Sequence, residues 1–361
     1  MAPQINRAAI SGIEVYALVL GDADCILVRA WTGNAPYCLL VDGGKAGHAK
    51  EVREFLRSRS IGHLHSIVCT HGHDDHAGGL IELLEDETLS VGEIAYHDPR
   101  DYVGEDAIKD ALRKAAGTTE ADVIRKTLDT VSELGRIVAR RRITRISPFR
   151  GDFIGFLQVL GPSPEFYRTL VTEFADAEQI RRASAIYGNL PNRQRDPDLE
   201  SSSLDDEPET SPVNESSIVL GEVLVNQTFM FTGDAGVKAL GQVASYYADS
   251  IRNVDYMQIP HHGSRNNINP ALISHFRPKK AFVCARQAGG HPSVAVVNAL
   301  KNVNARVYST GYHVASWLRY YQGNVPTVPG SAVPELWEAQ EDIQRRMAAA
   351  SPIPVVPAFK R

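Results

Sequence analysis

Residues 70–79 read Thr-His-Gly-His-Asp-Asp-His-Ala-Gly-Gly and directly follow the apolar run Ser66–Cys69. Imidazole and carboxylate side chains together are ligands for divalent metals such as zinc. Four such side chains are more than one tetrahedral ion needs from a single segment. The spacing therefore predicts a two-metal site where a strand passes into a loop, with four candidate ligands: His71, His73, Asp75 and His76.

The flanking residues indicate how the chain would present these ligands. The apolar spacing after the glycine pair predicts a helix that begins near Ala77, while the preceding strand would end at Thr70. His71 and His73 would then share one ion, and the next two ligands would bind the other. Histidines also cluster on solvated loops, but the metal interpretation uses all three histidines of the run.

This run resembles the HxHxDH signature of the metallo-β-lactamase fold hydrolases, and three further segments resemble that family in the same order: 39–44, 229–234 and 259–264. The resemblance implies that Asp42 lies beneath the metals and that Asp234 bridges both ions. The last of the three segments would supply the final histidine. The match covers about residues 12 to 312 and implies an α/β fold, the four-layer αββα sandwich.

Finer features are similar to the hydrolase domain of competence DNA-uptake channel proteins and to the choline-phosphate esterases of this fold. They lie in residues 21–24, 214–217, 260–264 and 290–292. The competence proteins often have Asp where this chain has His73, so the first metal site resembles that of ordinary lactamase-fold hydrolases and of the esterases. The membrane channel is absent, and we expect no transport role.

The first ion would have few protein ligands. Many lactamase-fold enzymes supply a third histidine from the strand before the bridging aspartate, but no histidine lies between His97 and His261. The resemblance therefore leaves His71, His73 and Asp234, completed by solvent. Open positions for water and substrate favour hydrolysis over a closed structural site.

The second ion would be bound by Asp75, His76, Asp234 and one histidine of the adjacent pair 261–262. We expect His262 to be that ligand, because the family's last ligand is commonly followed two positions later by Ser or Asp, which is Ser264 here. The alternative role for His261 is to support the ligands or to face the substrate.

A mechanism follows from these assignments. Two divalent ions lower the pKa of a shared water toward neutrality and so provide hydroxide as the nucleophile. We expect Asp234 to bridge the ions and Asp75 to orient the hydroxide. His291 lies in a Gly-Gly-His-Pro turn and is a candidate to stabilise or protonate the leaving oxygen, with a plain turn residue as the alternative. Three small polar residues are candidates to fix ligand tautomers: Ser264, Asn214 and Ser217.

The expected cofactors are two divalent ions, zinc first, with manganese or iron as alternatives. The expected activity is that of a metal-dependent hydrolase, first of all a phosphodiesterase or nuclease. Its substrate partner would be nucleic acid, a nucleotide or a related small-molecule phosphodiester. Two other functions stay open: hydrolysis of a neutral carbonyl compound, such as a lactone, lactam or thioester, and a non-catalytic scaffold that keeps the fold.

A basic cluster follows the helical pattern between residues 105 and 139: Arg136, Arg140, Arg141, Arg142, Arg145 and Arg150. Arginines grouped near a cleft bind phosphate groups, which makes Arg140, Arg141 and Arg142 candidate substrate-binding residues. The alternative is a solvated helix face.

Composition limits the protein's class. With 361 residues and 43% hydrophobic residues, the chain can form a large core, and the spread of its motifs favours one domain with insertions. A net charge of −5 gives no sign of a strongly basic nucleic-acid surface. We expect a cytoplasmic protein without a membrane segment, and cysteines that are small buried hydrophobes rather than disulfide partners: Cys25, Cys38, Cys69 and Cys284.

Three boundaries follow from the pattern along the chain. The hydrolase domain is expected over residues 1–325, with a helical insertion at about 100–150 that could wall the cleft. Residues 192–212 are rich in Pro, Ser and acidic side chains and predict a mobile loop. The tail, residues 326–361, has amphipathic helical spacing that could dock on the body, on a protein partner or on a second copy.

Overall fold

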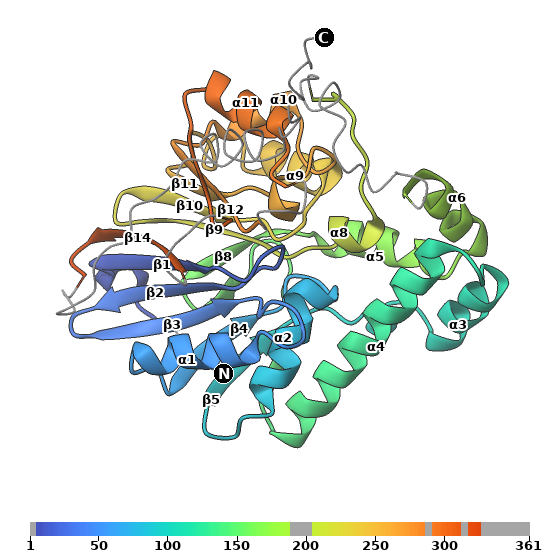
Figure 1. Cartoon of the computed structure of the whole chain (residues 1–361), viewed down its shortest axis with the longest axis horizontal. Coiled ribbons are helices and arrows are strands. Elements are labelled where there is room, and N and C mark those ends of the chain that lie inside the picture. The colour runs from blue at the N-terminus through green and yellow to red at the C-terminus, as the bar shows by residue number, and fades with distance from the viewer. Residues whose placement is uncertain (1–4, 188–203, 286–290, 312–316, 326–361) are drawn as a thin grey trace, which may run out of the picture.

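The computed structural model describes residues 5–187, 204–285, 291–311 and 317–325. Two mixed β-sheets lie face to face, and helices cover the outer face of each (Figure 1). This arrangement confirms the predicted α/β fold, a four-layer αββα sandwich.

The first sheet has seven described strands in the order β14-β1-β2-β3-β4-β5-β6. Neighbours from β14 to β3 are antiparallel, and neighbours from β3 to β6 are parallel. The strands are β1 (Gly12–Leu18), β2 (Ile26–Thr32), β3 (Ala35–Val41), β4 (His63–Val68), β5 (Ser90–Ala95), β6 (Thr144–Ile146) and β14 (Trp317–Gly323). The sequence pattern does not predict β14. This strand lies near the end of the described chain and pairs with β1, the first strand.

The second sheet has seven described strands in the order β13-β12-β11-β10-β9-β8-β7. Its strands from β10 to β13 are parallel, and those from β7 to β10 are antiparallel. They are β7 (Phe153–Ile154), β8 (Leu157–Gly161), β9 (Val219–Leu224), β10 (Gln227–Phe231), β11 (Tyr256–Gln258), β12 (Lys280–Val283) and β13 (Arg306–Ser309).

Both faces of each sheet are buried, which explains why many strands read as continuous apolar runs. Val15 on β1 and Phe229 on β10 belong to the core between the sheets, while Tyr16 on β1 faces the helical layer. Parallel strands need crossover connections, and helices supply them. On the first sheet these are α1 (Ala49–Ser58), α2 (Asp74–Leu84) and α4 (Thr119–Arg140); on the second they are α9 (Val237–Tyr246), α10 (Pro270–Phe276) and α11 (Val294–Asn302).

The predicted helical insertion is present as two helices, α3 (Glu105–Lys114) and α4. The helical conformation is interrupted between them near Gly117, whose φ of 87° favours glycine. Three helices that were not predicted adjoin them: α5 (Pro164–Glu173), α6 (Ala177–Tyr187) and the short α8 (Pro212–Glu215). Together they form a satellite core at one end of the sandwich (Figure 1).

Part of the expected mobile loop, residues 204–212, has defined tertiary contacts. Leu204 is buried in the core beside α9 and α10, and the hydroxyl of Thr210 accepts hydrogen bonds from two asparagine side chains. Long-range packing therefore orders residues 204–212, although the segment itself is polar. The remainder of that loop, 192–203, and the tail, 326–361, lie outside the described residues.

Candidate metal centre

The predicted ligands gather where parallel strands of the two sheets end. His71 follows β4, Asp234 follows β10 and His262 follows β11. Crevices outside the carboxyl ends of such strands are the usual binding positions of open α/β sheets. The strand order therefore brings together segments that are far apart in the sequence.

The helix α2 begins at Asp74, three residues before the predicted start at Ala77. His73 is extended (φ −68°, ψ 152°) and occupies the N-cap, so the first turn contains Asp74 and Asp75. The helix dipole favours carboxylates at this end, which explains the earlier start. Asp75 and His76 are consequently held by a helix rather than by a loop.

Glycines let the ligand loop pack closely against its supports. A Cβ at Gly72 would lie 2.7 Å from Thr127 Cγ2 and 2.8 Å from Val131 Cγ2, both on α4. A Cβ at Gly79 would collide with the carbonyl oxygen of Gly43. The helical insertion thus supports the ligand loop from behind.

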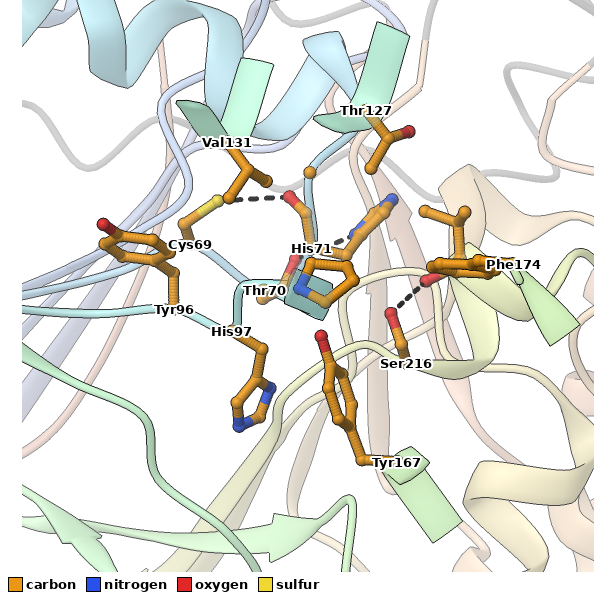
Figure 2. A pocket seen from close by; sticks show the side chains of 13 residues that line it. Cys69, Thr70, His71, Tyr96, His97, Thr127, Val131, Tyr167, Phe174 and Ser216 are labelled. Carbon is orange, nitrogen blue, oxygen red and sulfur yellow. Dashed lines mark hydrogen bonds between the residues drawn. The ribbon is translucent and has the colours of Figure 1, made fainter. Parts of the chain in front are cut away.

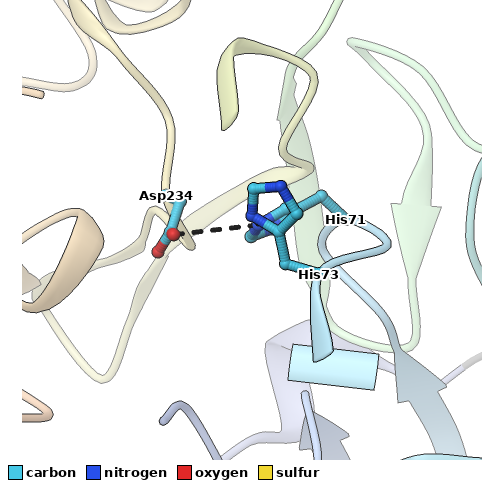
Figure 3. Close-up of side chains that lie close together, drawn as sticks. All are labelled: His71, His73 and Asp234. Carbon is cyan, nitrogen blue, oxygen red and sulfur yellow. Dashed lines mark hydrogen bonds and ion pairs between the residues drawn. The ribbon is translucent and has the colours of Figure 1, made fainter. Parts of the chain in front are cut away.

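The first cluster contains His71, His73 and Asp234, whose ligand atoms all lie within 4.8 Å of one another (Figure 3). His71 Nε2 lies 3.0 Å from His73 Nδ1 and 3.7 Å from Asp234 Oδ2. These are the three residues that the sequence assigns to the first ion.

The second cluster contains Asp75, His76 and His262, again within 4.8 Å of one another. His262 Nε2 lies 3.4 Å from Asp75 Oδ2, and His76 Nε2 lies 3.2 Å from Asp234 Oδ1. The two oxygens of Asp234 therefore face different clusters, Oδ2 the first and Oδ1 the second. This is the position that a bridging carboxylate requires.

The chemistry of these side chains fits divalent cations. The Nε2 atoms of His73 and His76 and both oxygens of Asp234 are buried without a hydrogen-bond partner among the described residues. Burial lowers the pKa of His73 to about 4 and that of His71 well below its usual value, so both rings offer lone pairs near neutral pH. Burial alone would raise the pKa of Asp234, but His261 and His76 hold it well below its usual range.

The remaining ring nitrogens are fixed from beneath. Asp42 accepts hydrogen bonds from Thr70 N, Thr70 Oγ1 and His76 Nδ1, each 2.8 Å long. His262 Nδ1 lies 2.6 Å from the carbonyl oxygen of Cys284, to which it donates. In the neutral rings, with the protons on Nδ1, both Nε2 atoms carry lone pairs that face the centre. Burial alone would lower the pKa of His76 and His262, but the neighbouring carboxylates raise it well above the usual value, so a bound cation would displace a proton from each ring.

The family model of the Metallo-beta-lactamase superfamily matches residues 19–285, which include both clusters. The chain belongs to this superfamily. Metallo-β-lactamase superfamily members are usually metal-dependent hydrolases and typically bind two divalent metals. No curated protein matches the chain.

Three solved structures are similar to the chain at low identity. The metallo-beta-lactamase fold protein YhfI from Bacillus subtilis has 10% identity and a TM-score of 0.44, with 86% of this chain and 100% of that chain covered. The Rm3 metallo-beta-lactamase has 12% identity and a TM-score of 0.33, with 80% and 90% covered. Unliganded yeast PDE1 has 10% identity and a TM-score of 0.36, with 83% and 98% covered. The finer similarity to competence proteins and choline-phosphate esterases stays a prediction.

His261 and His291 lie at the rim of this metallo-β-lactamase centre. His261 Nδ1 lies 2.9 Å from Asn267 Oδ1, its Nε2 lies 3.7 Å from Asp234 Oδ2, and 31% of its side chain is exposed. The ring centre of His291 lies 5.9 Å from that of His261. His262 joins the second cluster and His261 joins neither, which favours His262 as the ligand.

The three small polar residues have different partners. Ser217 Oγ accepts from Asp234 N at 3.2 Å and lies 3.3 Å from His71 Nδ1, so it contacts two candidate ligands. Asn214 Nδ2 lies 3.3 Å from His261 Nδ1. Ser264 Oγ instead accepts from the backbone N–H of Asn266, which stabilises its own turn.

Arg140 and Arg141 bind at a distance from the two candidate metal clusters. Arg140 pairs with Glu85, and Arg141 donates to the carbonyl oxygens of Leu84 and Leu89. These partners are at or beyond the C-terminal end of α2, about 16 Å along the helix from its metal-bearing end. Arg142 follows directly, with a φ of 55°. The contacts of Arg140 and Arg141 favour the alternative to substrate binding, and the role of Arg142 stays a prediction.

A small cavity of about 20 Å³ lies behind His71. Tyr167 from α5 directs its hydroxyl into this space, and His97 lines it (Figure 2). His97 Nε2 lies 2.8 Å from the carbonyl oxygen of Pro148, and burial lowers the pKa of His97 to about 3. The buried His97 ring is therefore neutral near pH 7.

Sequence reasoning missed several residues that build the centre. Asp24 is fully buried and forms a third possible cluster with His76 and Asp234. Asn267 donates to the carbonyl oxygen of Asp234 at 2.7 Å, and Gln258 lies beneath the same turn. The available signal was Asp24 itself, which stands between apolar residues in the sequence. Aspartate is rarely buried without a partner, so its place there indicates a specific contact.

Proposed function

We propose that this protein is a metal-dependent hydrolase of a small phosphodiester. The position of Asp234 supports the proposal most directly, because its two oxygens face two separate histidine clusters. His71, His73 and Asp234 would hold the first ion; Asp75, His76, His262 and Asp234 would hold the second. Mixed imidazole and carboxylate donors suit zinc first, with manganese or iron as alternatives.

Two bound ions would supply Lewis-acid activation of water and a positive clamp for the reacting phosphate. Asp75 is the ligand carboxylate most open to solvent, with 25% of its side chain exposed, and it would orient the attacking water. Asn267 Oδ1 accepts from His261 Nδ1, so the imidazolium form of His261 would offer its Nε2 proton to the leaving oxygen. His291 would assist from the same rim.

Two features favour a small phosphodiester over the other substrates. The rim is polar, with His261 and His291, and an apolar rim would be expected for a lactone or lactam. The predicted similarity to choline-phosphate esterases supports the same class. Arg140 and Arg141 bind the far end of α2, so they are not placed to bind the backbone phosphates of an extended polyanion such as DNA at the centre.

Metal analysis followed by a substrate panel tests this proposal. Protein purified without chelator should contain about two transition-metal ions per chain and hydrolyse bis-p-nitrophenyl phosphate. It should be slower on single- and double-stranded DNA and on lactone and lactam reporters. Activity confined to lactones or lactams would refute the phosphodiester assignment. A metal content near zero that does not rise with added zinc or manganese would refute the metal centre.

The matched variants are Asp234→Ala and the combined change of Arg140, Arg141 and Arg142 to Gln. Loss of the bridging ligand should lower turnover by orders of magnitude, about 10³-fold or more, while the sheets stay folded. The arginine variant should hydrolyse the small diester within about twofold of wild type, because its surface contacts are remote. Activity of Asp234→Ala near the wild-type level would contradict the assignment.

A further inference from the structure

Asp24 is a buried carboxylate outside the ligand sets proposed above. It lies in the turn between β1 and β2, has no exposed surface, and its Oδ1 has no hydrogen-bond partner among the described residues. Its Oδ2 accepts a 2.6 Å hydrogen bond from Gln258 Nε2. A buried charge is costly, so its position at the centre calls for a role.

Gln258 connects Asp24 to the turn that carries the bridging ligand. Its Oε1 accepts from the backbone N–H groups of Thr232 at 3.0 Å and Gly233 at 3.3 Å. Gly233 has a φ of 50° and directly precedes Asp234. One amide side chain therefore spans the first hairpin, β11 and the Asp234 turn.

The same turn is confined on its other side. A Cβ at Gly233 would lie 2.8 Å from Thr70 Oγ1, and Thr70 is itself bonded to Asp42. The turn is thus held between Thr70 and Gln258. A change at Gln258 would release one of these two supports.

Asp24 is not required to fix the tautomers of the nearby histidines. Its oxygens lie 3.6 Å from His262 Nδ1 and 3.8 Å from His76 Nδ1. Those nitrogens already have closer partners, Cys284 O at 2.6 Å and Asp42 Oδ2 at 2.8 Å. The close hydrogen bond of Asp24 is the one to Gln258.

We propose that Asp24 and Gln258 form a positioning pair that sets where the Asp234 carboxylate lies relative to the two histidine clusters. This inference rests on the metal centre proposed above. The direction of the bond is chemically defined, because Gln258 donates to Asp24 with its nitrogen and accepts the turn N–H groups with its oxygen. A carboxylate at position 258 would keep the acceptor but oppose Asp24.

Exchange of the two functional groups tests the pair. Gln258→Glu should place two buried carboxylates in contact, reduce zinc affinity by about tenfold or more, and alter the absorption spectrum of the cobalt-loaded protein. Asp24→Asn should change little, because its amide oxygen can still accept from Gln258. The double variant Asp24→Asn/Gln258→Glu should recover affinity to within about threefold, because the new amide donates to the new carboxylate.

Two controls separate positioning from general stability. Gln227→Glu makes the same chemical change at the start of β10, the end of the strand away from Asp234, and should keep the wild-type cobalt spectrum. Gln258→Met removes all three side-chain hydrogen bonds without adding charge, and should weaken zinc binding even if Gln258→Glu does not fold. Zinc affinity comes from chelator competition, and melting of the metal-free proteins gives the structural cost.

The outcomes distinguish this inference from the proposed function. A wild-type protein that binds no zinc or cobalt would overturn both. A wild-type protein that binds two ions, with Gln258→Glu and Gln258→Met matching its spectrum and affinity, would overturn the positioning pair alone. A double variant no better than Gln258→Glu would also overturn it.

Discussion

Replacement of Asp42 by Asn isolates the role of a single buried oxygen. Oδ1 of Asp42 accepts from Thr70 N, which cannot reverse its role, so the amide oxygen of Asn must take that position. The amide nitrogen then takes the position of Oδ2, which faces Thr70 Oγ1 and His76 Nδ1. Because the amide donates, His76 Nδ1 must accept and its proton must move to Nε2. The ring nitrogen that faces the second cluster would then carry a proton.

The size of the effect follows from this tautomer change. Loss of the group that orients a metal-binding histidine typically lowers metal affinity 10- to 100-fold, which equals about 1.4 to 2.8 kcal/mol. The loss should fall on the second ion, which His76 binds. The stability of the metal-free protein should change less, because Asn keeps its contacts with Thr70.

Zinc titration against a chromogenic chelator at neutral pH measures both binding steps. Asp42→Asn should weaken one step by the stated factor and leave the other within about threefold. The control is Asp255→Asn, since Asp255 also accepts a backbone N–H, that of Thr228 at 2.9 Å, but at the opposite end of β10. Equal affinities for wild type and Asp42→Asn would refute the tautomer argument.

Three further predictions concern the ligand helix, its support and a remote carboxyl. Asp75→Asn should abolish most turnover, whereas Asp74→Asn, at the neighbouring position outside both clusters, should keep most of it, as initial rates on a diester would show. Gly72→Ala should lower the free energy of unfolding by about 1 to 3 kcal/mol through overpacking on α4, against under about 0.5 kcal/mol for Gly104→Ala, where a Cβ meets nothing within 4 Å. Burial and a neighbouring glutamate raise the pKa of Glu120 from 4.5 to about 7, so stability is lost as the pH rises through this range. The free energy of unfolding, measured with urea, should therefore fall between pH 5 and pH 8, and Glu120→Gln should reduce this fall by up to about 3 kcal/mol. The same fall in the wild type and in Glu120→Gln would contradict this assignment.

The sequence predicted the ligands that lie close together in the chain, because local spacing limits how they can be arranged. His71 and His73 flank one glycine, and their order with Asp75 and His76 left few alternatives to a metal site. The αββα order was also readable, since strands buried on both faces form apolar runs that differ from helical spacing. The start of α2 was misplaced because the dipole effect of two aspartates at a helix end leaves no apolar signal.

The tertiary structure decided which distant residues meet. The turn containing Asp24 and the strand containing Gln258 are 234 positions apart, and only the stacking of the two sheets brings them into contact. The charge pattern of the arginines next to the insertion left phosphate binding and a solvated helix face both open, and the structure directs Arg140 and Arg141 to the far end of α2. Composition and periodicity describe each segment alone, whereas a site depends on the directions in which separate segments approach one another. That information is in the packing of the sheets and helices.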